Sequence, residues 1–275
     1  MSITKVASFA DGHTGGNPAG VHIADQHPSD LDMQAIAYDI GFSETAFAHR
    51  TDDGWRVRYF SPENEVPFCG HATIALGAVL AKQFGSDTFP LILNNASISV
   101  TGETQDTSHH AALQSPPTYS KPMDANLLRR VLDMFGYTQD DLDASMPPAF
   151  AHAGANHLVI ALSSRDGLRA MNYDLEAGRI LMLAEDLVTI MFVYAETPRY
   201  FHSRNAFASG GVLEDPATGA ATAAFAGYLR DLGWPHEGAI DLVQGEDMGS
   251  RSLLHAQIPA ESGSSIRVSG SVRFM

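Results

Sequence analysis

The sequence of 275 residues predicts an α+β fold made of two pseudo-symmetric domains, each arranged around a central helix. Three observations support this prediction: a segment that occurs twice, an order of strands and helices that occurs twice, and two helical stretches that are apolar on nearly every face. The length also favours two domains of ordinary size over one large core.

The repeated segment runs from Glu65 to Leu80, EVPFCGHATIALGAVL, and again from Glu214 to Leu229, EDPATGAATAAFAGYL. The two copies align without a gap, and seven of the sixteen positions are identical. Alanine-rich composition explains some of these matches, but the shared Glu, Pro and Gly lie at fixed offsets in the lead-in before the helix. A true internal repeat is therefore favoured.

The surroundings of the two copies also correspond, because each half has the order strand, strand, helix, strand, strand, helix. In the first half we predict two strands within 6–24, a helix at 31–40, strands at 43–50 and 56–60, and a helix after Gly70. In the second half we predict two strands within 149–162, a helix at 165–175, strands at 187–196 and 199–207, and a helix after Gly219. Helices as apolar as the last one in each half belong in the middle of a domain.

Prolines and polar residues in SPPTYSKPMD, residues 115–124, indicate a linker between the halves. We therefore predict a first domain at 1–115 and a second at 124–264, the second beginning with an amphipathic helix. Apolar and polar residues alternate in the last stretch, 265–275, which predicts a strand that completes the first domain or pairs with the second.

Composition and charge exclude several classes of function. The net charge of −15, without a run of Lys or Arg, is against nucleic acid as a partner. Apolar runs are too short to span a membrane, and the first residues have neither a signal-peptide nor a transit-peptide pattern, so we predict a cytoplasmic protein. The single cysteine, Cys69, permits no disulfide within the chain.

Both repeated helices begin after a Pro-x-x-Gly turn, at Gly70 and Gly219. Unpaired N–H groups and a partial positive charge at such helix starts suit the binding of a substrate carboxylate. The copies differ at three chemically important positions, where Val66, Cys69 and His71 of the first match Asp215, Thr218 and Ala220 of the second. We therefore predict an asymmetric site.

Glu44 is the one ionisable residue at the apolar entry to the strand SETAF. Burial favours the protonated form of a carboxyl group, which suits a residue that must both take and return a proton. Glu44 is thus the leading candidate for a general acid/base, the alternative being an exposed glutamate at a strand end. His71 and Asp215 are either further proton carriers or a satisfied polar residue and a helix N-cap.

Several motifs occur in one order along the chain: GGNPAGV, FSETAF, FSPENEVPFCGHATIALGAVL and EDPATGAATAAFAGYL. With these motifs, and with QGEDMGSRS at 244–252, the sequence resembles the PhzF-like isomerase family of phenazine biosynthesis. The resemblance implies a fold like that of diaminopimelate epimerase, with a curved and mostly antiparallel sheet around each central helix and the active site between the domains. It also implies an enzyme that needs no cofactor and forms a homodimer.

By this resemblance Glu44 is the catalytic glutamate that moves a proton between carbons of a small carboxylated metabolite, assisted by His71 and Asp215. The family often has serine where this chain has Ala220, which argues against the phenazine precursor as substrate. The residues expected to bind substrate lie in the same motifs: Asn17, Ser43, Cys69, Gly70, Thr218, Gly219 and Ala220.

Two other functions remain open. The related racemases use two cysteines at the matched helix starts, but this chain has Thr218 opposite Cys69, so only a one-thiol epimerase or dehydratase is compatible with it. A binding protein that has lost its chemistry is the other alternative. We predict no metal, because His109 and His110 lack partners at metal-ligand spacing.

Overall fold

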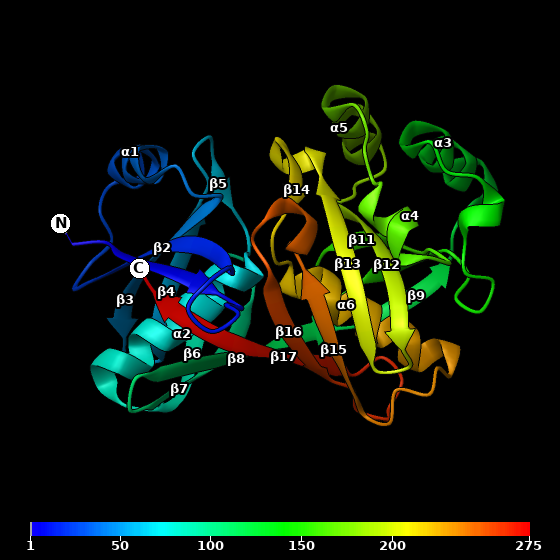
Figure 1. Cartoon of the computed structure of the whole chain (residues 1–275). Coiled ribbons are helices and arrows are strands. Elements are labelled where there is room, and N and C mark those ends of the chain that lie inside the picture. The colour runs from blue at the N-terminus through cyan, green and yellow to red at the C-terminus, as the bar shows by residue number, and fades with distance from the viewer. Residues whose placement is uncertain (1) are drawn as a thin grey trace. The chain divides into compact units, whose positions relative to one another are not determined.

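The computed structural model describes residues 2–275 and divides the chain into two compact units (Figure 1). Unit 1 contains the residues up to Gln114 together with Ser269–Met275, and unit 2 contains Ser115–Val268. Each unit combines strands with a central helix, so the predicted α+β fold with two similar halves is confirmed.

Eight strands of unit 1 form a closed barrel, in which each strand pairs with two neighbours in the ring β1–β2–β3–β4–β6–β7–β8–β17. The strands are β1 (Thr4–Ser8), β2 (Asn17–Ala24), β3 (Glu44–Thr51), β4 (Gly54–Phe60), β6 (Asp87–Ile92), β7 (Ser97–Gln105), β8 (Ser108–Pro117) and β17 (Ser265–Phe274). The β2–β3 and β4–β6 pairs are parallel. A short strand, β5 (Glu65–Val66), pairs antiparallel with the end of β4 just before the central helix.

The central helix of unit 1 is α2 (Gly70–Phe84), whose residues 70–81 are all buried against the strands around it. Helix α1 (Asp30–Ile40) lies on the outside of the sheet, where Met33 and Ala37 pack on Phe47 and Phe60. Side chains alternate between the two faces of β3, so Phe47 faces α1 while Glu44 faces α2. This alternation brings the glutamate to the interior.

Unit 2 has a sheet with the strand order β9–β10–β11–β12–β13–β15–β16, and β14 pairs with β13. Its strands are β9 (Tyr119–Pro122), β10 (Ala149–His152), β11 (Asn156–Ala161), β12 (Thr189–Thr197), β13 (Tyr200–Phe207), β14 (Val212–Asp215), β15 (Ala239–Gln244) and β16 (Ser252–Gln257). Helix α6 (Gly219–Leu232) packs on one face of this sheet.

The other face of the unit 2 sheet carries three helices: α3 (Ala125–Phe135), α4 (Arg165–Arg169) and α5 (Leu175–Ala184) (Figure 1). Leu158, Ile160, Ile190 and Phe192 of the sheet form an apolar core with them. Short 3-10 turns complete the unit: η1 (Gln139–Asp141), η2 (Ala208–Gly210) and η3 (Glu246–Met248).

Two segments differ from the sequence-based expectation. The single helix expected at 165–175 is two helices, because Asp174 caps the start of α5 by accepting a hydrogen bond from the N–H of Ala177. Residues 115–124, expected to be a linker, contain the end of β8 and all of β9. The last strand, β17, was expected to complete the first domain or to pair with the second, and its final residues pair with β1 of unit 1.

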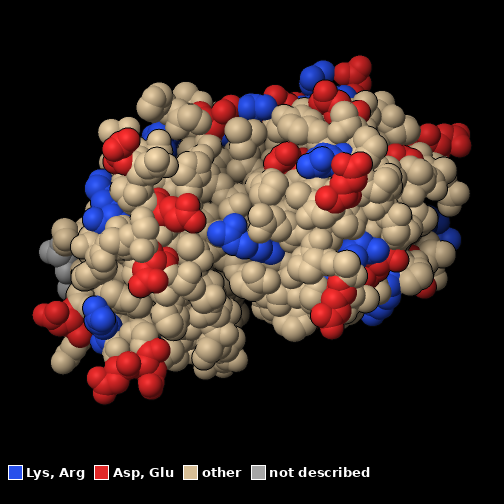
Figure 2. Space-filling model, turned by 90° about the horizontal axis from the view of Figure 1, so that it is seen from below, with Lys and Arg blue, Asp and Glu red and all other residues tan. Residues whose placement is uncertain are grey.

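Charged side chains are dispersed in small groups over the face drawn in Figure 2. Acidic groups outnumber basic ones there, in keeping with the net charge of −15. Within residues 2–275, no helix is both long and apolar enough to cross a membrane.

Candidate active site

The candidate site of unit 1 gathers three side chains from two neighbouring elements: Glu44, Cys69 and His71. Glu44 is the first residue of β3, Cys69 is the N-cap residue of α2, and His71 lies in the first turn of that helix. Their exposed fractions are 7%, 8% and 5%, so all three are almost entirely buried. The alternative that Glu44 is an exposed residue at a strand end is therefore wrong.

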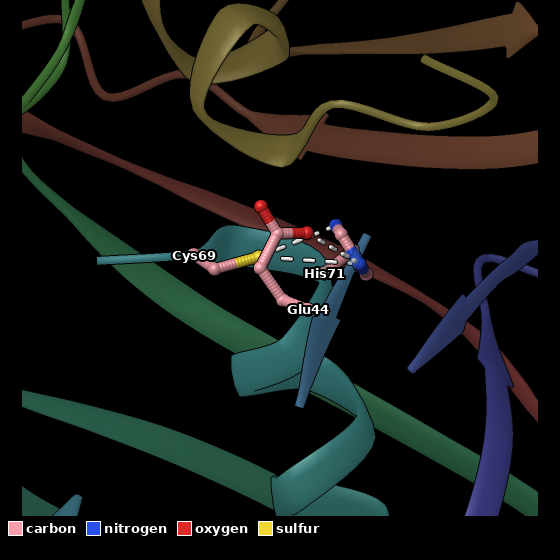
Figure 3. Close-up of side chains that lie close together, drawn as sticks. All are labelled: Glu44, Cys69 and His71. Atoms are coloured by element: carbon pink, nitrogen blue, oxygen red, sulfur yellow. Dashed lines mark hydrogen bonds and ion pairs between the residues drawn. The ribbon is translucent and has the colours of Figure 1, made fainter. Parts of the chain in front are cut away.

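The imidazole of His71 lies between the other two groups. Its Nε2 is 3.4 Å from Oε2 of Glu44, and its Nδ1 is 3.3 Å from Sγ of Cys69. Figure 3 shows the carboxyl group and the thiol both directed toward the ring, with one carboxyl oxygen pointing away from it. Oε2 of Glu44 is buried and accepts no hydrogen bond from residues 2–275. The carboxyl group can therefore exchange a proton with the imidazole or with a bound molecule.

Two serines hold the histidine in this position. Oγ of Ser43 is 3.3 Å from Nε2 of His71, and the buried hydroxyl of Ser8 donates a hydrogen bond of 2.7 Å to its backbone carbonyl. Asn17 lies opposite Ser8 in the β1–β2 pair and is 2% exposed. Ser8 was not identified from the sequence, since no motif marks a serine that acts through a backbone carbonyl 63 residues away.

The first turn of α2 contains no acid, and the side chain of Cys69 makes no capping hydrogen bond, two features that suit the binding of an anion. Thr73 instead fixes the turn, donating from Oγ1 to the carbonyl of Cys69 at 2.7 Å. Before the turn, Arg58 binds Glu65 through two hydrogen bonds, and the guanidinium lowers the pKa of that carboxyl. Hydrogen bonds thus fix the chain before Gly70, at Glu65, and after it, at Thr73.

Unit 2 holds a second polar cluster at the N-terminus of α6. Thr218 donates a hydrogen bond from Oγ1 to Oδ2 of Asp215, which is 5% exposed. The fully buried side chain of Gln244 binds both residues, donating to the carbonyl of Asp215 at 2.6 Å and accepting from the N–H of Thr218 at 3.0 Å. Gly219 begins the helix and is buried, and Ala220 is half-buried.

Gln244 holds Asp215 and Thr218 in place, a role that the sequence did not reveal. It is the first residue of QGEDMGSRS, which was noted only as a motif, and it fixes the loop that carries Asp215 and Thr218. The structure therefore brings together Glu44, Cys69, His71 and Ser43 in unit 1, and Asp215, Thr218 and Gly219 in unit 2. The location of the active site between the two domains stays a prediction.

Among residues 2–275, Glu44, Cys69 and His71 form a group of side chains that could hold a metal ion. One donor atom from each lies within 4.8 Å of the other two. In the sequence only His109 and His110 were considered as metal ligands. Glu44 is far along the chain from Cys69 and His71, so the sequence does not show that the three are close in space. The prediction that the protein uses no metal stays a prediction.

Comparison with known proteins identifies the family. The model of the PhzC-PhzF family, described as phenazine biosynthesis-like protein, matches residues 6–274. The chain belongs to this family. The resemblance seen in the motifs is therefore confirmed over nearly the whole length.

Relatives in this family are named isomerases. Trans-2,3-dihydro-3-hydroxyanthranilate isomerase of Pseudomonas fluorescens is 31% identical over 282 residues, covering 96% of this chain and 94% of that protein. The uncharacterized isomerase YddE of Escherichia coli (strain K12) is 30% identical over 274 residues, covering 93% and 89%. The function of the chain is thus of the isomerase type.

Solved structures support the fold. A PhzF-family protein of Bacillus anthracis superposes with a TM-score of 0.85 at 19% identity, covering 99% of this chain and 96% of that one. A probable proline racemase of Agrobacterium radiobacter K84 superposes with a TM-score of 0.68 at 9% identity, covering 99% and 90%. The predicted epimerase-like fold is confirmed by both.

Proposed function

We propose that this protein isomerises a small carboxylate-bearing metabolite by moving a proton from one carbon to another, without a cofactor. Glu44 takes the proton from a carbon that is acidified by a neighbouring group and returns it to a second carbon. One observation carries the proposal: a carboxyl group that is 7% exposed, with an oxygen that accepts no hydrogen bond, lies within 3.4 Å of an imidazole.

In this proposal His71 stabilises Glu44 in both of its protonation states. When its proton is on Nε2, the ring can stabilise the carboxylate that is present before proton abstraction. Ser43 can donate a hydrogen bond to the same nitrogen when the ring proton is on Nδ1. The histidine thus adapts to either protonation state of the glutamate, as a residue that accompanies reversible proton transfer must.

The starts of α2 and α6 supply the substrate-binding part of the proposal. Neither Cys69 nor Thr218 caps its helix with a side-chain hydrogen bond, and neither helix has an acid in its first turn. Backbone N–H groups at these ends are suited to a carboxylate or to an oxygen that gains negative charge during the reaction. Asp215, beside the second helix start, is proposed as a partner for a polar or cationic group of the substrate.

The substrate is proposed to differ from that of the hydroxyanthranilate isomerases. Ala220 follows DPATG, where the family often has serine, so this chain offers no hydroxyl to a substrate at that position. The loss of a hydrogen bond to a charged partner is worth about 1.5 to 3 kcal/mol, which changes substrate preference without changing the type of reaction.

The test is proton exchange in deuterated water. Candidate small carboxylates are incubated with the unchanged chain and with Glu44→Gln, and deuterium bound to carbon is measured by mass spectrometry. We expect exchange with the unchanged chain and a decrease of about 10²- to 10⁴-fold with Glu44→Gln. Normal exchange by a folded Glu44→Gln protein would contradict the assigned role. The far-ultraviolet circular dichroism of the variant serves as the control for folding.

A one-thiol epimerase or dehydratase is the second candidate, favoured by the contact of 3.3 Å between Sγ of Cys69 and Nδ1 of His71. An imidazole at this distance can take the proton of the thiol and leave a nucleophilic or basic thiolate. In that case Cys69→Ser abolishes exchange while Glu44→Gln retains it. Our proposal predicts the reverse order of the two losses.

A further inference from the structure

The cluster of Glu44, Cys69 and His71 has the donor chemistry of a zinc site. Thiolate sulfur, imidazole nitrogen and carboxylate oxygen are the protein ligands that Zn²⁺ takes, whereas Mg²⁺ and Ca²⁺ take oxygen ligands. Three protein ligands with a fourth position left to water or an anion make a complete tetrahedral zinc shell. The three residues therefore suffice for an open site.

One donor atom from each of the three side chains lies within 4.8 Å of the other two. Zinc bonds of about 2.3 Å to sulfur and about 2.0 to 2.1 Å to nitrogen and oxygen bring such atoms to about 3.3 to 3.6 Å from one another. Nε2 of His71 is 3.4 Å from Oε2 of Glu44, whereas Sγ of Cys69 lies nearer Nδ1, at 3.3 Å, than Nε2, at 3.9 Å. The imidazole therefore rotates on zinc binding, so that one of its nitrogens faces both Glu44 and Cys69.

The surroundings add one independent reason. Oε2 of Glu44 is buried and accepts no hydrogen bond from residues 2–275, so a bound cation would satisfy it. This gain opposes the repulsion between the ion and the positive end of α2.

We propose that Glu44, Cys69 and His71 together bind one Zn²⁺ ion, and that bound zinc inhibits the enzyme. The Cys69 thiol releases its proton to solvent as the sulfur–zinc bond forms, and Glu44 and His71 bind through a carboxyl oxygen and a ring nitrogen. Inhibition follows because the ion occupies the carboxyl group that takes the substrate proton, and this part rests on the proposed function. The binding part does not.

Binding is tested without a substrate. The chain, stripped of metal with a chelator, is titrated with ZnCl₂ in a calorimeter and with CoCl₂ in an absorption spectrometer. We expect one zinc ion per chain and a sulfur-to-cobalt charge-transfer band in the near ultraviolet. Cys69→Ser should lose the band and weaken zinc binding by more than about 100-fold, since even the outer-shell partners of zinc ligands are worth about 10- to 100-fold. MgCl₂ should give no comparable heat.

His110→Ala, which removes an exposed histidine outside the cluster, is the matched control and should bind zinc like the unchanged chain. Equal zinc affinity of Cys69→Ser and the unchanged chain, or cobalt binding without the charge-transfer band, would overturn the zinc site. Tight binding that leaves turnover unchanged would instead contradict the role of Glu44 while the site stands. If Glu44→Gln loses proton exchange and the unchanged chain binds no zinc, the zinc site is refuted and the proposed function stands.

Discussion

The segments that lead into α2 and α6 are built with the same contacts. Arg58 binds Glu65 in the first, and Arg204 binds Glu214 in the second, in each case between β-strands that pair just before the helix. Thr73 and its counterpart Thr222 each donate a hydrogen bond to the carbonyl of the N-cap residue. These side chains stabilise the turn and the helix start, and both copies of the repeat contain that structure.

The strand register identifies further counterparts that differ. Phe47 lies opposite Arg58, and Phe192 lies opposite Arg204, so the residues three positions earlier, Glu44 and Thr189, correspond. Thr189 is fully buried and its hydroxyl is 2.8 Å from Nδ1 of His157. The position of the proposed proton carrier thus holds a structural threonine in unit 2.

A second pair of counterparts differs in how its polar atoms are satisfied. Tyr59 lies opposite Val66, and Asn205 lies opposite Asp215, the residue that matches Val66 in the repeat. The hydroxyl of Tyr59 is 2.6 Å from Oγ1 of Thr73, and burial raises the pKa of this tyrosine. Both side-chain polar atoms of Asn205 are buried without a hydrogen-bond partner in residues 2–275. The duplicated fold has kept its framework, while polar side chains at its interior positions have diverged.

The largest effect should come from making the first half resemble the second at the proposed proton carrier. Glu44→Thr copies Thr189 and removes the carboxyl group, so proton exchange should fall by about 10²- to 10⁴-fold. The reciprocal control, Thr189→Val, removes only a structural hydroxyl and should keep most of the exchange. A comparable loss in both variants would mean that the two positions do not differ in function.

The two ion pairs should differ in their contribution to stability. Arg204 and Glu214 have side-chain exposures of 13% and 6%, against 18% and 26% for Arg58 and Glu65. Arg204→Met leaves a buried carboxylate without its partner and should lower the free energy of unfolding by about 3 kcal/mol or more. Arg58→Met should cost less, about 2 kcal/mol, because Glu65 is more hydrated. Urea denaturation of both variants measures the order, and the reverse order would contradict the argument from burial.

His157 should make unit 2 sensitive to acid. It lies opposite Thr189, as Ala19 of unit 1 lies opposite Glu44, so Ala19 is its counterpart and has no group that titrates. Burial lowers the pKa of His157 to about 3, so below about pH 6.5 the unfolded chain binds a proton that the folded chain refuses. Its contribution to stability is complete above that pH and falls as the pH drops toward 3. Between pH 7 and pH 5 the free energy of unfolding should fall by about 2 kcal/mol more than in His157→Gln. Parallel pH profiles of the two proteins would refute this.

The smallest effect should distinguish Tyr59 from Asn205. Tyr59→Phe removes the hydrogen bond to Thr73 and should cost about 1 kcal/mol. Asn205→Leu has nearly the same volume and removes two unsatisfied polar atoms, so it should be neutral or stabilise the fold by about 1 kcal/mol. Thermal unfolding of both variants gives the two signs. Destabilisation by Asn205→Leu would show that the amide has a partner in solution.

Local patterns predicted much of the fold and the candidate residues. Alternating strands, the two apolar helices and the fixed offsets of Glu, Pro and Gly are properties of short segments, and they identified the two halves. The strands at 87–105 and 239–257 were not assigned. β6 pairs with β7 and β15 with β16 as neighbours along the chain, but each hairpin joins its sheet through a parallel pair, with β4 or with β13, which short patterns do not specify. The split between α4 and α5 was missed because it depends on the single cap at Asp174.

The sequence by itself determined the repeat, the family and the identity of Glu44, His71 and Asp215 as candidates, because these follow from residue types at fixed spacing. Only the tertiary structure decided that Glu44 is buried and that Cys69 and His71 lie against it. That proximity arises from the closing of the barrel around α2, which brings residues 25 and more positions apart into contact. Gln244 and Ser8 became visible for the same reason, since each acts through a backbone group that is distant in the chain and close in space.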